Sequence, residues 1–152
     1  MTTANNMLTS VNEIIGKKLD DLGVYYQMFI FCFDEYELHA NCFTRIIHKQ
    51  DILVPTDDYQ NWDEKESKHN DMWYNVATYG NVIAGGTVQT VEISPVNDLT
   101  IILDNDIRIE LFNSNGYHHY SEEREQWFYY KPKDETYPFI SVSSKTIERG
   151  DD

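Results

Sequence analysis

The sequence predicts one α+β domain, mainly antiparallel β, with a central curved sheet or small sandwich, a short N-terminal helix and one further helix near residues 67–79. Residues that favour strands (Tyr, Val, Ile, Phe and Thr) are abundant, and aromatic residues make up 14% of the chain. Apolar and polar residues alternate in several short segments, as they do in half-buried strands. The 152 residues fit a single domain over 1–152, with frayed ends expected at 1–6 and 148–152.

The first predicted element is the short helix. Its apolar residues follow helical spacing: Met7, Leu8, Val11, Ile14 and Ile15. Gly16 can end the helix in a left-handed conformation. Ser10 and Glu13 have the spacing of a capping box, so a start at Val11 is equally compatible with the sequence.

A β-hairpin is predicted next. The run Met28–Phe33 is apolar on both alternating faces, as expected of a central strand covered on two sides. Asp34 and Glu35 form the turn. In the following strand, apolar and polar residues alternate, so one face is predicted to be buried (the dry face) and the other exposed to solvent. Its dry face comprises Leu38, Ala40, Cys42 and Ile46.

The clearest structural pattern lies between Thr87 and Phe112 and predicts a three-stranded meander. The first strand contains Val91 and Ile93 and ends at a turn over 94–98. Apolar residues face each other throughout the next hairpin if the pairs are Leu99 with Leu111, Ile101 with Ile109, and Leu103 with Ile107. This register leaves a three-residue loop, Asp104-Asn105-Asp106, in which Asn or Asp tolerates a positive φ.

Two further strands are predicted at 126–131 and 139–147, with Pro132 and Pro138 bracketing their connection. Ahead of the meander, Gly85-Gly86 predicts a bulge or bend. It lacks the Gly-Lys-Ser/Thr ending of a phosphate loop and leads into a strand.

The charge of the chain is strongly negative, with 26 acidic and 12 basic residues and a formal net charge of −14. Such a field repels nucleic acid and anionic membranes and attracts basic partners. Residues 51–100 carry nine acidic and two basic residues, or −7, which is half of the total. Acidity that merely keeps the protein in solution is the alternative explanation.

Most of the acidic residues of 51–100 lie within 51–79. This segment does not show the alternation of a strand, so we predict a long excursion from the sheet. Trp62, Trp73 and several tyrosines are interleaved with the acids. Part of the segment, 67–79, is compatible with a helix that has Met72, Val76 and Tyr79 on one side. Exposed aromatic residues beside carboxylates are typical of protein-binding sites, although the tryptophans could instead cap the core.

Residues that could support catalysis form no convincing set. On a regular strand, His39 and Cys42 point to opposite faces, and His118 and His119 add no zinc-binding spacing. Glu122, Glu123 and Glu125 resemble a solvated turn, and the acids near Asp57 lack the EF-hand pattern. We therefore expect no enzyme activity, no cofactor and no bound metal.

Several strand-and-turn motifs resemble a small bacterial family of unknown function. They are Leu38-His39-Ala40-Asn41-Cys42-Phe43-Thr44-Arg45-Ile46, Ile52-Leu53-Val54, Asp57-Asp58, Thr87-Val88-x-x-Val91, Asp98 to Asn105, Ile109-x-Leu111-Phe112 and Trp127. The tryptophan that precedes Arg-Ile in the family is replaced here by Phe43-Thr44. Proteins of this kind are similar to the immunity proteins of contact-dependent-inhibition and polymorphic toxin systems.

The resemblance implies an immunity protein that binds and neutralises a cognate toxin domain, and the acidity favours a basic nuclease as that partner. The predicted contact residues are Asp57, Asp58, Tyr59, Trp62, Asp63, Glu64, Glu66, Asp71, Glu122 and Glu123. One alternative is a nucleic-acid mimic that inhibits a DNA- or RNA-binding protein. Another is a hydrolase using His39, His118 or His119.

The expected setting is the bacterial cytoplasm. No apolar run approaches the ~20 residues needed to span a bilayer, and the first residues are polar. With no signal peptide recognised, reduced thiols are expected at Cys32 and Cys42. The partner is expected to be a protein, with no direct contact to nucleic acid or membrane.

Overall fold

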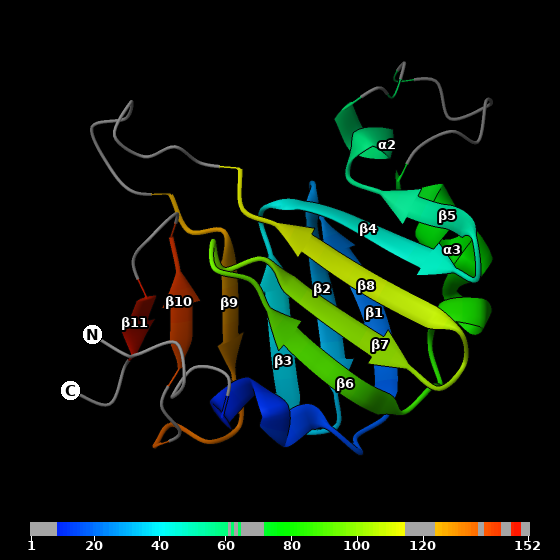
Figure 1. Cartoon of the computed structure of the whole chain (residues 1–152). Helices are drawn as coiled ribbons and strands as arrows, with labels where there is room; N and C mark the ends of the chain where they lie inside the picture. Colours follow the sequence, from blue (N-terminus) through cyan, green and yellow to red (C-terminus); the bar gives the residue numbers. More distant parts are fainter. Residues whose placement is uncertain are drawn as a thin grey trace.

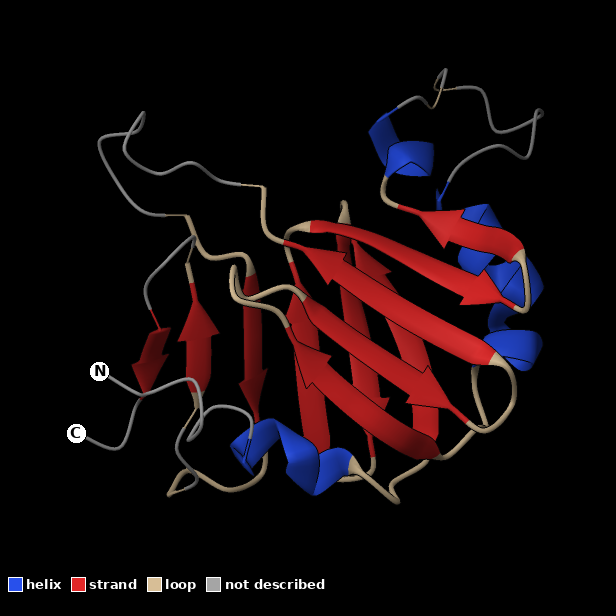
Figure 2. Ribbon diagram, in the orientation of Figure 1, coloured by secondary structure: helices blue, strands red, loops and turns tan. Residues whose placement is uncertain are grey.

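The computed structural model describes residues 9–60, 62, 64, 72–114, 124–136, 139–143 and 147–149. These residues form an α+β domain in which two antiparallel sheets pack face to face around one core (Figure 1). The strands of the front sheet run obliquely across those of the rear sheet (Figure 2). This confirms the predicted fold class in its sandwich form.

The rear sheet has six strands in the order β1-β2-β3-β9-β10-β11. Their bounds are β1 (Leu19–Tyr25), β2 (Met28–Phe33), β3 (Tyr36–Ala40), β9 (Trp127–Tyr130), β10 (Ile140–Val142) and β11 (Ile147–Arg149). The front sheet has five strands in the order β5-β4-β8-β7-β6. Their bounds are β4 (Phe43–His48), β5 (Asp51–Pro55), β6 (Val88–Ile93), β7 (Leu99–Leu103) and β8 (Ile107–Phe112).

Helical elements are few. Residues 9–11 are helical and run into a 3-10 turn, η1 (Asn12–Ile14), after which Gly16 has a φ of +87° as predicted. The other two are α2 (Asp57–Gln60) and α3 (Met72–Ile83). Among the described residues, no helix combines the length and the apolar character needed to cross a membrane.

The core lies between the sheets and is rich in aromatic rings. Phe29, Phe31 and Phe33 project from β2 into it and are fully buried. Trp127 at the start of β9 is also fully buried, and its indole N–H donates to the carbonyl of Asn97 at 2.9 Å. The Tyr129 hydroxyl donates to the carbonyl of Ser10 at 3.1 Å, which fastens the N-terminal helical turn to the rear sheet.

The meander register is confirmed. Leu99 pairs with Leu111 and Ile101 with Ile109, and Asp106 in the connecting loop has a φ of +63°. The bend before the meander is also present, because Gly85 has a φ of +101°. A Cβ on Gly86 would overlap the side chain of Asn105, so glycine is required there.

Two strand predictions were wrong, for related reasons. The second strand of the predicted hairpin is two strands: β3 ends at Ala40 in the rear sheet, and β4 starts at Phe43 in the front sheet. Alternation persists through this corner because both strands face the same core. The β2 strand is covered on one face only, since Met28, Ile30 and Cys32 on its other face are partly exposed.

The predicted excursion over 51–79 is partly wrong as well. Residues 51–55 form β5, which pairs with β4 in the front sheet. Helix α3 exists but continues to Ile83, and it packs against β1, β4 and β5 through Met72, Val76 and Ile83. The predicted strand over 139–147 is divided into β10 and β11, and fraying of the chain ends stays a prediction.

Candidate functional site

The predicted acidic site begins directly after β5, where the short helix α2 leaves the front sheet. Thr56 fixes this point: its hydroxyl accepts from the Thr44 N–H at 2.8 Å, and its own N–H donates to the Thr44 carbonyl at 2.8 Å. Both threonines are buried. Asp57 and Asp58 are the next two residues and form the first turn of α2, so the hydrogen bonds of Thr56 hold the start of this acidic turn against β4.

Asp58 connects α2 to α3. The Asn75 side-chain amide donates to Oδ2 of Asp58 at 2.9 Å. Burial raises the pKa of the Asp58 carboxyl, and the neighbouring charge of Asp57 raises it further, while the bond from Asn75 lowers it. Among the described residues, the neutral Asn75 amide is the only hydrogen-bond donor to this partly desolvated carboxylate, which is an unfavourable setting for a negative charge.

An aromatic cluster lies beside this carboxylate. The Trp73 ring on α3 makes perpendicular contacts with two rings, Tyr59 at 5.5 Å and Trp62 at 5.3 Å between centroids. Trp73 remains 36% exposed and Tyr74 41% exposed. The indole N–H of Trp62 is buried and has no hydrogen-bond partner among the described residues. The cluster therefore exposes apolar ring area, mainly that of Trp73, while the Trp62 N–H stays buried.

The outer face of α3 continues this surface. The helix contains no charged residue, although the chain carries 26 acidic and 12 basic residues. Its exposed positions recur at helical spacing: Trp73, Tyr74, Ala77, Thr78, Asn81 and Val82. We call the combined area, formed by Asp57, Asp58, Tyr59, Trp62, Trp73 and Tyr74, the α2–α3 surface.

The structure brings some of the predicted contact residues together. Asp57, Asp58, Tyr59 and Trp62 belong to the α2–α3 surface, and Glu64 lies near them in the chain and is exposed. The remaining predicted contact residues lie outside the described residues: Asp63, Glu66, Asp71, Glu122 and Glu123. Trp73, Tyr74 and Asn75 were missed as contact residues. The predicted helix over 67–79 contained all three residues, but the sequence did not show which face of that helix lies beside Asp58.

Several ion pairs lie outside the α2–α3 surface. Glu110 on the front sheet contacts both Arg45, at 2.7 Å, and Arg108, at 3.5 Å. Lys17 pairs with Asp34, and Lys131 with Glu35. No lysine or arginine of the described residues pairs with Asp58 or Glu64, so the negative charge of these two residues is not offset by a described cation.

His39 and Cys42 do not share a strand, which the sequence argument had assumed, because β3 ends at Ala40 and β4 begins at Phe43. His39 lies on the outer face of β3, with its Nε2 2.6 Å from Oε1 of Glu37. Cys42 is buried in the corner between β3 and β4, and burial raises the pKa of its thiol to about 12. Such a thiol is protonated at neutral pH and is a poor nucleophile. His118 and His119 lie outside the described residues.

Other candidates for acid–base or metal chemistry are also weak. Glu125 accepts a hydrogen bond from the Ser141 hydroxyl at 2.6 Å and is exposed. Within the part of the chain that the structure describes, no group of three His, Cys, Asp or Glu side chains could hold a metal ion. The α2–α3 surface is therefore the stronger candidate site.

Comparisons with known proteins were made by family model, by curated sequence and by solved structure, and none of the three found a match. The resemblance to immunity proteins accordingly stays a prediction.

Proposed function

We propose that this protein binds a basic protein domain through the α2–α3 surface, and that the bound partner is a toxin domain which it neutralises as an immunity protein. The aromatic cluster of Tyr59, Trp62 and Trp73 beside the Asp58 carboxylate is the observation that carries the proposal. Exposed tryptophan and tyrosine rings supply most of the affinity at many protein interfaces.

The charge distribution supports a basic partner. The net charge of −14 accelerates encounter with a positively charged surface in a salt-dependent way. Asp58 adds a local reason, because a carboxylate that is partly desolvated beside Asp57 is relieved by an incoming cation. A lysine or arginine of the partner could pair with Asp58 and lie against the Trp73 ring at the same time.

The proposal is tested with the product of the open reading frame adjacent to this gene. We expect the C-terminal domain of that product to arrest growth when expressed alone. Co-expression with this protein should restore growth, and the two proteins should co-purify. Continued killing together with failure to co-purify would refute the proposal.

Matched charge variants locate the interface. Asp57→Asn with Asp58→Asn removes two charges from the α2–α3 surface, and Asp51→Asn with Asp106→Asn removes two exposed charges from the turns at the far end of the front sheet. Both double variants have the same net charge. We expect only the first pair to weaken the complex by about tenfold or more, as measured by calorimetry at physiological salt. Equal losses would show that bulk acidity, and not this surface, attracts the partner.

A further inference from the structure

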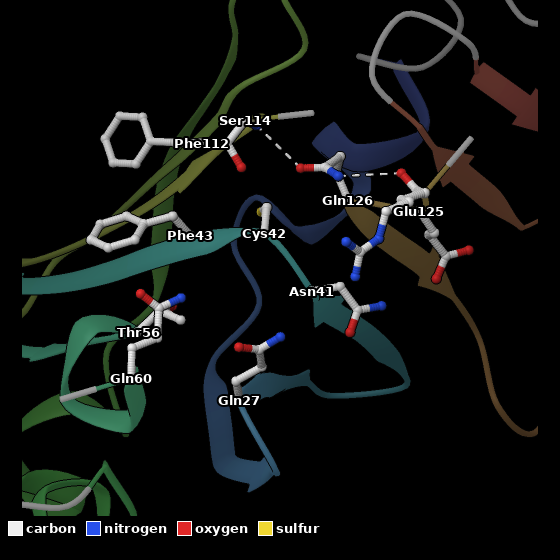
Figure 3. A pocket seen from close by; sticks show the side chains of 11 residues that line it. Gln27, Asn41, Cys42, Phe43, Thr56, Gln60, Phe112, Ser114, Glu125 and Gln126 are labelled. Atoms are coloured by element: carbon white, nitrogen blue, oxygen red, sulfur yellow. Dashed lines mark hydrogen bonds between the residues drawn. The ribbon is translucent and has the colours of Figure 1, made fainter. Parts of the chain in front are cut away.

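A second feature of the same end of the molecule is an open cleft of about 830 Å³. It lies at the corner where the chain passes from the rear sheet to the front sheet, between β3 and β4 (Figure 3). The turn between β1 and β2, the start of β4, helix α2 and the residues flanking β8 and β9 all contribute to its walls. None of the sequence motifs considered above pointed to it.

The floor of the cleft is rigid because its polar groups are satisfied internally. The Gln126 carbonyl accepts from the backbone N–H groups of Asn41 and Cys42, at 2.8 and 2.9 Å. The Gln126 side chain accepts from the Ser114 N–H at 3.2 Å and donates to the Arg124 carbonyl at 3.2 Å. This buried glutamine therefore connects the corner between β3 and β4 to the residue that follows β8 by two positions, Ser114.

The walls of the cleft, in contrast, carry polar side chains that are not used by the fold. The amides of Gln27, Asn41 and Gln60 form no hydrogen bond with any of the described residues, and neither does the guanidinium of Arg124. In Figure 3 the Gln27, Asn41 and Gln60 side chains surround the opening, on the side away from Gln126. Each amide offers both a donor and an acceptor, so together they match a ligand that also carries both.

Aromatic residues complete the site. Phe43 and Phe112 form one wall, with their ring centroids 6.3 Å apart. Tyr25 and Tyr26, directly before Gln27, are 61% and 63% exposed and contact each other edge to face at 4.7 Å. These two tyrosines precede the lining residue Gln27 in the chain and do not themselves line the cleft. Exposed tyrosines close to adaptable amide side chains are typical of antibody paratopes, which bind protein loops.

We propose that this cleft holds an extended, uncharged loop of the same protein partner, and this inference rests on the proposed function. A peptide backbone presents alternating N–H and C=O groups. Each of the three free amides can accept a hydrogen bond from an N–H or donate one to a C=O. Arg124 and Glu125 offset one another in charge, so the lining does not select an ion. An anionic ligand such as a nucleotide is disfavoured by the net charge of −14.

Helix α2 joins the cleft to the α2–α3 surface. Gln60 at its C-terminal end lines the cleft, while Asp58 and Tyr59 on the same helix contact α3. A single partner can therefore place a basic surface over α2 and α3 and insert a neighbouring loop into the cleft. The charged surface would then promote association, and the inserted loop would slow dissociation.

The cleft is tested first with peptides, independently of the toxin. A random library of peptides about 12 residues long, displayed on phage, is selected against the full-length protein. We expect selected peptides to lose affinity by about tenfold or more against Asn41→Trp, which fills the cleft, and to a smaller degree against Gln60→Ala. Gln50→Trp and Gln50→Ala are the controls, because Gln50 is an exposed amide in the turn between β4 and β5. Urea denaturation confirms that each variant folds.

Three results would overturn the inference. The selection could return no binding peptide, the selected peptides could bind Asn41→Trp as tightly as the wild type, or a glycan array could show carbohydrate binding that Asn41→Trp alone abolishes. Measuring how the variants bind the toxin domain distinguishes a failure of this inference from a failure of the proposed function. A complex weakened by Asp57→Asn with Asp58→Asn, but unaffected by Asn41→Trp, would leave the proposed function intact and refute the role of the cleft.

Discussion

The tryptophans of this protein occupy two contrasting environments. Trp127 is fully buried between the sheets, and its indole N–H donates to the Asn97 carbonyl at 2.9 Å. Trp73 is 36% exposed, and the buried N–H of its neighbour Trp62 has no partner among the described residues. The same residue type is therefore fully used for stability in one region and left partly unused in the other. We proposed above that the second region binds a partner, and the predictions below test this difference.

The largest expected effect is the loss of stability when the buried Trp127 is replaced. Trp127→Ala should lower the free energy of unfolding by about 3–5 kcal/mol, because it leaves a large cavity between the sheets. Trp127→Phe retains most of the ring but leaves the Asn97 carbonyl without its donor, which should cost about 1–3 kcal/mol. Urea denaturation at neutral pH measures both. A loss smaller for Ala than for Phe would contradict the assignment of Trp127 to the core.

The second prediction concerns alkaline pH and also tests the core. Burial raises the pKa of the Cys42 thiol from 9.0 to about 12 and, with the nearby Glu13 carboxylate, the pKa of the Tyr36 hydroxyl from 10.0 to about 12. Both groups contribute stability that is fully present below pH 9. Above that pH the unfolded chain loses protons that the folded chain retains, so stability should fall progressively as the pH rises toward 12.

Denaturation midpoints at about pH 8 and about pH 10.5 test this dependence. The decrease between them should be smaller in Cys42→Ala, and smaller again when Tyr36→Phe is added. A midpoint independent of pH in the wild type would show that these two groups are not protected from ionisation by the fold.

The third prediction moves to the α2–α3 surface. Trp73→Ala should lower the free energy of unfolding by less than Trp127→Ala does, because Trp73 is 36% exposed whereas Trp127 is fully buried. Binding to the toxin domain should nevertheless weaken by about 2 kcal/mol or more, which is the effect of losing an interface hot spot. Tyr79 lies on the same helix but packs against the core. Tyr79→Ala should therefore lower the free energy of unfolding more than it weakens binding. Calorimetry and urea denaturation of both variants separate the two outcomes.

The smallest expected effect is also the most diagnostic. Because the fold raises the pKa of the Asp58 carboxyl, the folded state favours its protonated form. The resulting stability is fully present below the unfolded pKa and is lost as the pH rises through the folded pKa. Asp58→Asn should therefore raise the melting temperature slightly at neutral pH while weakening the complex. A variant that binds more weakly but folds more stably identifies a residue retained for function. If Asp58→Asn lowers both stability and affinity, Asp58 is instead a structural residue.

Local patterns predicted the elements that depend on neighbouring residues. The register of β7 and β8 followed from matching apolar residues across the hairpin, because a slip of one residue would turn every side chain to the wrong face. The turn at Asp34 and the bend at Gly85 were predicted from polar residues and glycines between strands, and both residues have a positive φ. The interleaving of acids with aromatic residues near α2 predicted a binding surface there, which stays a prediction.

The parts that sequence did not reveal depend on contacts between distant residues. Alternation from Leu38 to Ile46 gave no indication of the break at Asn41 and Cys42, because both strands present their apolar side to one core. The free amides of the cleft could not be recognised either. Gln27, Asn41 and Gln60 are ordinary polar residues in sequence, and they become a site only where three corners of the chain meet.

The sequence by itself determined a mainly antiparallel α+β domain, its meander register and its concentration of acidic charge, because alternation, turn residues and net charge are local or additive properties. Only the tertiary structure decided that the strands form two sheets, that Asn75 on α3 partners Asp58 on α2, and that a cleft opens beside α2. Each of these requires residues far apart in the chain to meet. Their positions are set by how the two sheets share one core and not by any local pattern.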